Sequence, residues 1–372
     1  MPGKILILAL MLLGLPLAGV ILAGMPLERY LEFPPRTLYV VHAPFSWWAF
    51  WAYALLILMV IFPFLKRGLQ RHPRVHKPRH PTLPFPWWGW LGLLLGAVSW
   101  TLAWSRFPWF EALQAHTFTP LWISYILTMN ALTYRRTGRC PLLDRTVSYL
   151  LLFPASALFW WFFEYLNRFV QNWYYVGGTF EPREYFWYAT LAFSTVLPAF
   201  TATREWILSF PWFTGKFSDF LTLAPSRPKL LAALALTISA PGLAGLGIWP
   251  DFLFSLLWMS PLLILVSLQA LFGEPHVFSP LREGDWGLLV SSAIAALLCG
   301  VFWEVWNFYS FAKWRYQVPF VQRFPIFEMP ILGYAGYLPF GVECAVIADM
   351  LLASRPPSVP GSCGHAGRSH PQ

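Results

Sequence analysis

WFFEYLNRF (Trp161–Phe169) and VFWEVWNFY (Val301–Tyr309) are the two stretches around which this chain is organised. Each places a glutamate and an asparagine three residues apart near the end of an otherwise apolar run, and the two copies are 140 positions apart. In a helix this spacing sets the carboxylate and the carboxamide on one face. The paired residues are Glu164 with Asn167 and Glu304 with Asn307.

The composition is that of a membrane protein. Of 372 residues, 57% are hydrophobic and only 12% are charged, and the mean hydropathy is +0.52. Soluble domains carry about a quarter of charged residues, so this chain is suited to a lipid solvent. The 22 Trp, 33 Phe and 15 Tyr residues exceed what interfacial belts need, which predicts packed aromatic rings in the interior.

Several function classes find no support. The net charge of +9 does not indicate a nucleic-acid partner, because the basic residues lie in short loops between apolar runs, where they set orientation. Neither the histidines nor the four cysteines, Cys140, Cys299, Cys344 and Cys363, have metal-ligand spacing, so we expect neither a metal centre nor a cofactor. Nucleotide-binding and nucleophile-elbow motifs are also absent from the sequence, so any chemistry belongs in or beside the bilayer.

Ten apolar segments are long enough to cross a hydrocarbon core of about 30 Å, which takes roughly 20 helical residues. The predicted fold class is therefore all-α, a polytopic integral membrane protein with about ten transmembrane helices. The predicted spans are Ile5–Ala23, Pro44–Leu65, Pro86–Arg106, Thr117–Tyr134, Val147–Val170, Tyr185–Thr203, Leu230–Gly247, Phe252–Phe272, Trp286–Ser310 and Phe327–Leu352.

The first span has two interpretations. It resembles a retained helix in length, whereas a cleaved signal sequence would use Lys4 as its basic region and a poor cleavage site at 22–24. We favour the retained helix. With the N-terminus inside, 18 of the 26 Lys and Arg residues fall in cytoplasmic segments and 8 outside. This bias predicts a bacterial-type cytoplasmic membrane location with both termini in the cytoplasm.

Further matches extend the internal repeat. Trp109 and Glu111 match Trp249 and Asp251 at the offset of 140, and after one inserted residue Trp173, Tyr175 and Pro198 match Trp314, Tyr316 and Pro339 at 141. We therefore predict two tandem four-helix repeats in parallel orientation, related by a pseudo-twofold axis along the membrane normal. The predicted units are an N-terminal two-helix segment (1–65), a basic cytoplasmic linker (66–85), repeat A (86–208), a connecting loop (209–228), repeat B (229–352) and a disordered tail (353–372).

The repeat predicts where a site would form. If the fifth and ninth helices meet at the seam between the halves, their acid–amide faces oppose each other. The result would be a polar centre with aromatic walls contributed by Trp161, Phe162, Phe302, Trp303 and Trp306. Residues expected to contact a substrate there are Asn167, Asn307, Arg168, Trp303 and Trp306.

Three buried acids are the candidates for chemistry: Glu164, Glu304 and Glu343. An ionised carboxylate at the bilayer centre costs about 2.5–3.5 kcal/mol, and no Lys or Arg lies deep in a span to offset it. We expect desolvation to keep Glu304 and Glu343 neutral for much of the time, which suits proton donation and acceptance. Glu343 follows Pro339 and Gly341, where we expect a kinked helix.

Structural roles compete with these assignments. Arg168 lies four residues after Glu164, the spacing of a helical ion pair, whereas repeat B has Phe308 at the equivalent position. The two asparagines can instead bridge helices by hydrogen bonds. Asp349 is expected at a solvated helix end, with Arg204 and Glu205 forming an interfacial pair.

Three functions fit this pattern. The favoured one is a membrane-embedded enzyme that uses carboxyl acid–base chemistry on a lipid or isoprenoid-like substrate, because polar residues are few and aromatic residues abundant. The second is a secondary transporter, in which the same carboxyls couple protons to transport. The third is a scaffold whose acid–amide pairs only lock helices together. Membrane lipid is the expected partner, and the sequence does not determine the oligomeric state.

Overall fold

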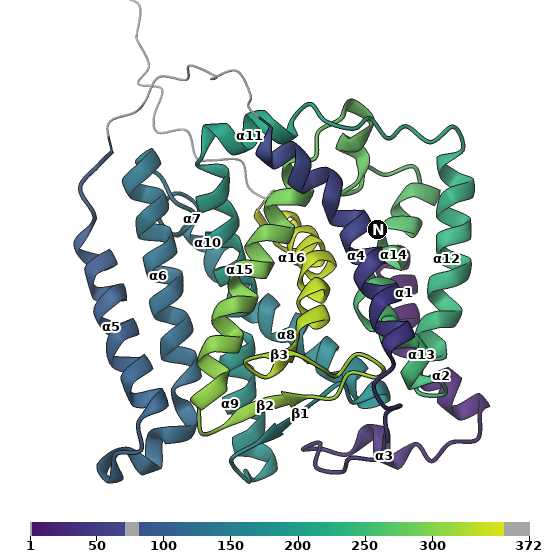
Figure 1. Cartoon of the computed structure of the whole chain (residues 1–372), viewed down its shortest axis with the longest axis horizontal. Coiled ribbons are helices and arrows are strands. Elements are labelled where there is room, and N and C mark those ends of the chain that lie inside the picture. The colour runs from purple at the N-terminus through teal and green to yellow at the C-terminus, as the bar shows by residue number, and fades with distance from the viewer. Residues whose placement is uncertain (1, 71–81, 353–372) are drawn as a thin grey trace, which may run out of the picture.

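A computed structural model describes residues 2–70 and 82–352, and it shows a bundle of helices with two short β-sheets at one end (Figure 1). We refer to this end as the β1–β2 end. Most of the predicted basic linker and the whole predicted tail lie outside the described residues.

The elements follow the repeat boundaries closely. The N-terminal part contains α1 (Pro2–Ala9), the π-helix η1 (Leu10–Gly14), α2 (Leu15–Leu22), α3 (Glu28–Leu31) and α4 (Trp47–Leu69). The next part contains α5 (Trp87–Trp104), η2 (Pro108–His116), α6 (Phe118–Thr137), α7 (Pro141–Asp144), α8 (Thr146–Val170), β1 (Trp173–Val176), α9 (Pro182–Phe193), α10 (Val196–Leu208) and α11 (Pro211–Phe217). The last contains α12 (Pro228–Ala244), α13 (Pro250–Leu253), α14 (Leu256–Leu271), η3 (Ser279–Glu283), α15 (Gly287–Tyr309), β2 (Lys313–Tyr316), β3 (Pro325–Ile326), β4 (Met329–Pro330), η4 (Ile331–Gly336) and α16 (Tyr337–Leu352).

Helical structure lies over each of the ten predicted apolar segments. By length and composition, five helices in the described part of the chain are apolar enough to cross a membrane, and α12 and α14 are apolar but shorter. The five are Gly3–Leu22, Trp47–Leu69, Thr146–Val170, Gly287–Tyr309 and Ile331–Leu352.

Two predicted spans differ in detail. The sixth is divided between α9 and α10, where the hydroxyls of Ser194 and Thr195 donate to the carbonyls of Leu191 and Ala192 and so compete with the helical backbone pattern. The predicted kink at Pro339 is absent. Because α16 begins at Tyr337, the proline lies in the first turn, where its missing N–H leaves no hydrogen bond unmade.

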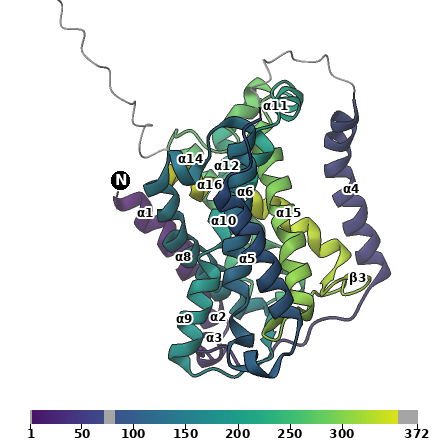
Figure 2. The same cartoon turned by 90° about the vertical axis from the view of Figure 1, so that its left-hand side faces the viewer.

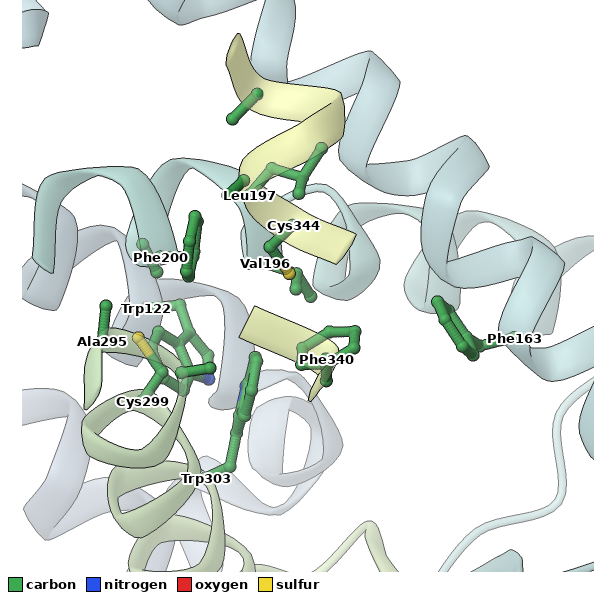
Figure 3. Packing of buried hydrophobic residues seen from close by; sticks show 14 of the residues in the cluster. Trp122, Phe163, Val196, Leu197, Phe200, Ala295, Cys299, Trp303, Phe340 and Cys344 are labelled. Carbon is green, nitrogen blue, oxygen red and sulfur yellow. The ribbon is translucent and has the colours of Figure 1, made fainter. Parts of the chain in front are cut away.

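The centre of the bundle is formed by α10 and α16. Each of them packs against both α8 and α15, so the two acid-bearing helices are joined through these central helices. Phe340 of α16 lies between Phe163 of α8 and Trp303 of α15, with ring centroids at 5.6 and 6.2 Å (Figure 3). Phe163 and Trp303 are equivalent positions of the predicted repeat. The buried aromatic interior predicted from composition is confirmed.

The N-terminal helices flank this core on opposite sides, with α1 at one side and α4 at the other (Figure 2). Helix α2 packs on α12 at Gly19, where a Cβ atom would lie 1.8 Å from the carbonyl oxygen of Ala244. Only a glycine permits this approach. Between α2 and α4, residues 24–46 cross the β1–β2 end, and we call them the N-terminal strap.

Candidate functional site

The acid-bearing helices α8 and α15 are each followed at once by a strand, and the two strands pair antiparallel. Trp173 lies opposite Tyr316, Tyr174 opposite Arg315 and Tyr175 opposite Trp314. This pairing brings the C-terminal ends of α8 and α15 to the same small sheet at the β1–β2 end (Figure 1).

The two asparagines hold these strands to their helices. The Asn307 amide donates to the carbonyl of Trp314 at 2.8 Å, and the Trp314 N–H donates to Asn307 Oδ1 at 2.9 Å. Asn167 makes the same two bonds with Trp173, at 2.8 and 3.4 Å. Each carboxamide therefore replaces a missing backbone partner just beyond a helix end. The alternative of a helix-to-helix bridge is replaced by a helix-to-strand bridge.

Glu164 is buried at 6% exposure and is surrounded by aromatic donors. Its Oε1 accepts from the indole of Trp173 at 2.9 Å, the hydroxyl of Tyr175 at 2.5 Å and the indole of Trp160 at 3.2 Å. Hydrogen bonds that converge on one carboxyl oxygen stabilise negative charge there. Glu164 also lines a gap of about 20 Å³, enough for one water molecule, beneath Pro35 and Leu38 of the strap.

Glu304 is fully buried and has an equivalent but not identical setting. Its Oε1 accepts from the hydroxyls of Tyr316 at 2.7 Å and Tyr337 at 2.9 Å, and the indole of Trp314 donates to Tyr316. Its Oε2 is buried without a hydrogen-bond partner among residues 2–70 and 82–352. One oxygen of this carboxyl is therefore free to exchange a proton with a bound molecule.

The third donor has moved between helices in the two halves. Trp160 of α8 corresponds to Gly300 of α15, and the space left by this glycine is filled by Tyr337 of α16. A Cβ atom at Gly300 would lie 2.5 Å from the Tyr337 ring. The position equivalent to Tyr337 in the first half is Val196. A tyrosine hydroxyl from α16 thus supplies the hydrogen bond that an indole from α8 supplies in the other half.

A continuous set of aromatic contacts links the two carboxyls. Trp160, which donates to Glu164, has its ring centroid 6.0 Å from that of Trp303. Trp303 in turn stacks on Tyr337 at 5.9 Å, and Tyr337 donates to Glu304. The acids share one aromatic interior rather than a direct contact.

The two tyrosines of the sheet act as fixed donors. Burial raises the pKa of Tyr175 and of Tyr316 well above the usual value, and the neighbouring Glu164 and Glu304 carboxylates raise it further. Both hydroxyls therefore keep their protons throughout the physiological range and donate to the carboxyls.

The other predicted site residues have different surroundings. Trp303 and Trp306 are buried against Trp122, with ring centroids at 5.0 and 5.1 Å. The Trp306 indole nitrogen is buried without a partner in the described part of the chain. Trp161 instead faces α9, where it stacks on Phe186, so its predicted place in the aromatic wall of the centre was wrong.

Glu343 lies apart from the Glu164–Glu304 centre. Its Oε1 accepts from the backbone N–H of Leu262 at 3.2 Å, just after Pro261 inside α14. Its Oε2 is buried without a partner among the described residues. The carboxyl thus satisfies a donor in a helix that a proline interrupts.

Arg168 does not form the helical ion pair considered for Glu164. Its Nη2 contacts Glu32 of the strap at 3.3 Å and donates to the carbonyl of Arg29. Gln171 also binds the strap, since its Oε1 accepts from the backbone N–H groups of Tyr39 and Val40 at 2.8 and 2.9 Å. The strap is therefore bound directly over the end of α8.

Sequence reasoning missed several residues of this centre. Tyr175 and Tyr316 were found as repeat matches, but only the fold shows that they contact the two carboxyls. Trp160 and Tyr337 carry no matching signal, because neither has an equivalent of its own type in the other half. The strap residues Arg29 and Glu32 lie outside the repeat altogether.

Fold and composition together indicate a helical membrane protein with two buried carboxyls in an aromatic interior. The chain matches no protein-family model, and neither a curated protein nor a solved structure is significantly similar to it.

Proposed function

We propose that the chain forms ten membrane-spanning segments in two four-helix repeats, with both termini in the cytoplasm. The strand register supports the duplication: Tyr174 lies opposite Arg315, its own equivalent at an offset of 141. Exchanging the halves turns the pair Trp173–Tyr316 into Trp314–Tyr175, which is the other observed pair. Such self-consistent pairing is what a pseudo-twofold axis through the sheet produces.

The packing of the helices supports the same axis. Helices α5 and α6 pair closely in the first half, and α12 and α14 pair closely in the second. The proposed topology is tested by reporter fusions in bacterial cells. Alkaline phosphatase inserted at Gly178 should be active, and the same enzyme fused after Leu352 should be inactive. The reverse pattern would contradict the orientation.

We further propose that the protein is a membrane-embedded enzyme acting on a lipid or isoprenoid-like substrate by proton transfer. The observation that carries this proposal is the Glu304 carboxyl, which is fully buried, held by two tyrosine hydroxyls at Oε1 and unpartnered at Oε2. A positioned carboxyl of this kind is suited to general acid–base catalysis.

The proposed step is a rearrangement of a carbon–carbon double bond. Glu304 in its acid form donates a proton to one alkene carbon, and the faces of Trp303 and Trp160 stabilise the resulting carbocation. A carboxylate, that of Glu164 in this proposal, then takes a proton from a neighbouring carbon, whose C–H electrons form the new double bond. No oxidant or cofactor is required, and the protons balance.

Entry of a substrate requires movement. The gap beside Glu164 has a volume of only about 20 Å³, so a lipid has to displace the strap residues Pro35 and Leu38 that close it. Such displacement is within reach of a segment bound mainly by hydrogen bonds at its polar side chains.

The test is the Glu304→Gln variant, which keeps the shape of the side chain and removes the titratable group. We expect lipid extracts of cells producing this variant to lose a product seen with the wild type and to accumulate its precursor, measured by mass spectrometry. The precursor should still copurify with the variant. Glu111→Gln, at an exposed glutamate of η2, is the matched control.

The opposite outcome is equally specific. If Glu304→Gln and Glu164→Gln fold normally and leave every lipid unchanged, the acid–base proposal fails and the scaffold explanation is preferred.

A carrier is the second candidate, and Glu343 is the observation that favours it. A buried carboxyl bound to a proline-interrupted helix resembles the discontinuous-helix sites of secondary transporters. In proteoliposomes, a carrier would show a pH-dependent solute flux that Glu343→Gln abolishes. An enzyme would show no such flux.

A further inference from the structure

Two guanidinium groups lie side by side where the strap meets the end of α8. Arg29 of α3 and Arg168 of α8 both lie over the ring of Tyr39, with distances of 4.8 and 5.6 Å from the guanidinium carbon to the ring centroid. Arg168 also donates to the main-chain carbonyl of Arg29. The positions of both guanidinium groups are therefore set by the fold.

The two arginines have unused hydrogen-bonding capacity. The Nε atoms of Arg29 and Arg168 are both buried without a hydrogen-bond partner within the described ranges. Arg168 itself is only 9% exposed. Buried donors of a charged group that lack a partner are costly, so a site built in this way is complete only when an anion is bound.

The one carboxylate beside them is mainly committed elsewhere. Glu32 accepts from the hydroxyl of Thr37 at 2.8 Å and from its backbone N–H at 2.9 Å, whereas its contact with Arg168 is 3.3 Å. Two guanidinium groups thus share one carboxylate that is held by Thr37, and the cluster keeps an excess of positive charge.

The cluster is next to the candidate site. Arg168 lies one helical turn after Glu164, and both side chains line the same small gap under Pro35 and Leu38. A molecule with its anionic group on Arg168 would therefore direct its remaining part toward Glu164 and the aromatic interior. This is the arrangement that an amphipathic lipid requires, with the polar group at the β1–β2 end of the bundle and the chain inside it.

We propose that Arg29 and Arg168 bind the phosphate or diphosphate group of an anionic lipid, with the phosphate replacing Glu32 on Arg168 when the strap moves. Two planar guanidinium groups match a phosphate because each can donate two parallel hydrogen bonds to it. This inference rests on the proposed function, since it names the substrate class of that site.

The experiment measures binding of a soluble probe to the detergent-purified full chain. The probe is dihexanoyl phosphatidic acid, titrated calorimetrically alongside dihexanoyl phosphatidylcholine and inorganic phosphate. We expect the phosphatidic acid to bind, and Arg168→Gln and Arg29→Gln to weaken its affinity about tenfold or more, as expected for losing hydrogen bonds from a charged group. Arg183→Gln, at an exposed arginine of the same end, should bind as the wild type does.

Other results would overturn the proposal. Equal binding of phosphatidic acid and phosphatidylcholine would show that the phosphate monoester is not recognised. Inorganic phosphate binding as tightly as phosphatidic acid would assign the site to free phosphate instead of a lipid. Unchanged affinity in Arg168→Gln, confirmed as folded by its melting temperature, would make the arginines a structural staple. Should Arg168→Gln fail to fold, Arg168→Lys with Arg29→Gln carries the same test.

The two proposals fail separately. Binding is measured without turnover, so a Glu304→Gln variant that binds the probe normally but changes no lipid in cells leaves the headgroup site intact. Conversely, a wild type that transforms a lipid but binds no phosphatidic acid keeps the enzyme proposal and removes this one.

Discussion

The exchange of a hydrogen-bond donor between Trp160 and Tyr337 shows how a single position can differ between two similar halves. At Gly300 the absence of a Cβ atom admits the Tyr337 ring, and the tyrosine hydroxyl then reaches Glu304 at 2.9 Å. In the other half Trp160 occupies the equivalent position and donates to Glu164 itself. Both carboxyls keep an aromatic donor although the residues that supply it differ.

Gly300→Ala should therefore remove the Tyr337 hydrogen bond from Glu304. The added Cβ would lie 2.5 Å from the ring, and overpacking of this kind costs about 1–3 kcal/mol. We expect a lower melting temperature in detergent, and loss of the same product that Glu304→Gln loses. Gly336→Ala is the control, since nothing lies within 4 Å of its Cβ position. Equal melting temperatures for the two variants would contradict the proposed packing.

At the scale of the element, the N-terminal strap is held by polar contacts rather than by burial. Gln171, in a left-handed conformation at the end of α8, accepts from two strap N–H groups and donates to the carbonyl of Thr37 at 2.8 Å. His42 and the N–H of Ala43 bind Asp251 at 2.7 and 3.0 Å. The strap therefore contacts both halves of the protein, and titration of its acids can release it.

Glu32 gives the strap a pH dependence. Burial on its own would raise the pKa of this carboxyl, but hydrogen bonds from the backbone and side chain of Thr37 outweigh it and keep the pKa below 4.5. Because the pKa is lower in the folded than in the unfolded chain, this stabilisation is present above pH 4.5 and is lost as the pH falls through the folded value.

We therefore expect hydrogen exchange of the strap amides, corrected for intrinsic rates, to accelerate in the wild type when the pH is lowered from about 7 to about 3. Glu32→Gln should show fast exchange at both values. A wild-type strap whose corrected exchange does not change with pH would show that Glu32 does not hold it.

For the whole molecule, two contacts tie the halves together at opposite ends of the central helices. One is the β1–β2 pairing. The other is the ion pair between Arg204 of α10 and Asp349 of α16, in which Nη1 lies 3.0 Å from Oδ2 and Nη2 contacts Oδ1. The predicted Arg204–Glu205 pair and the predicted solvated Asp349 were therefore wrong, because the tertiary fold brings α10 against α16.

Asp349→Leu should destabilise the protein more than the double variant Arg204→Leu, Asp349→Leu. The single change leaves Arg204, which is 3% exposed, buried without its counter-charge. We expect a cost of about 1–3 kcal/mol, reduced from that of a fully buried pair because the Asp349 side chain is 41% exposed. Melting temperatures of both single variants and the double variant give the coupling. Additive losses would mean that the pair contributes nothing.

Much of the fold is readable from local sequence. The ten apolar segments each contain helical structure, because a run of apolar residues in lipid leaves the backbone no partner except itself. The acid–amide pairs, repeated at a constant offset, marked the ends of α8 and α15 and the strands that follow. Burial of Glu164 and Glu304 could also be expected, since both lie within apolar runs.

The partners of those acids were decided only by the tertiary structure. Glu164 faces Trp173 and Tyr175, not Arg168, because the strand folds back over the helix while the strap takes up the arginine. Glu304 receives Tyr337 because α16 packs at Gly300. Hydrophobic periodicity determines that a segment is helical and buried, but the choice of hydrogen-bond partner depends on contacts between segments far apart in the chain, which no local pattern encodes.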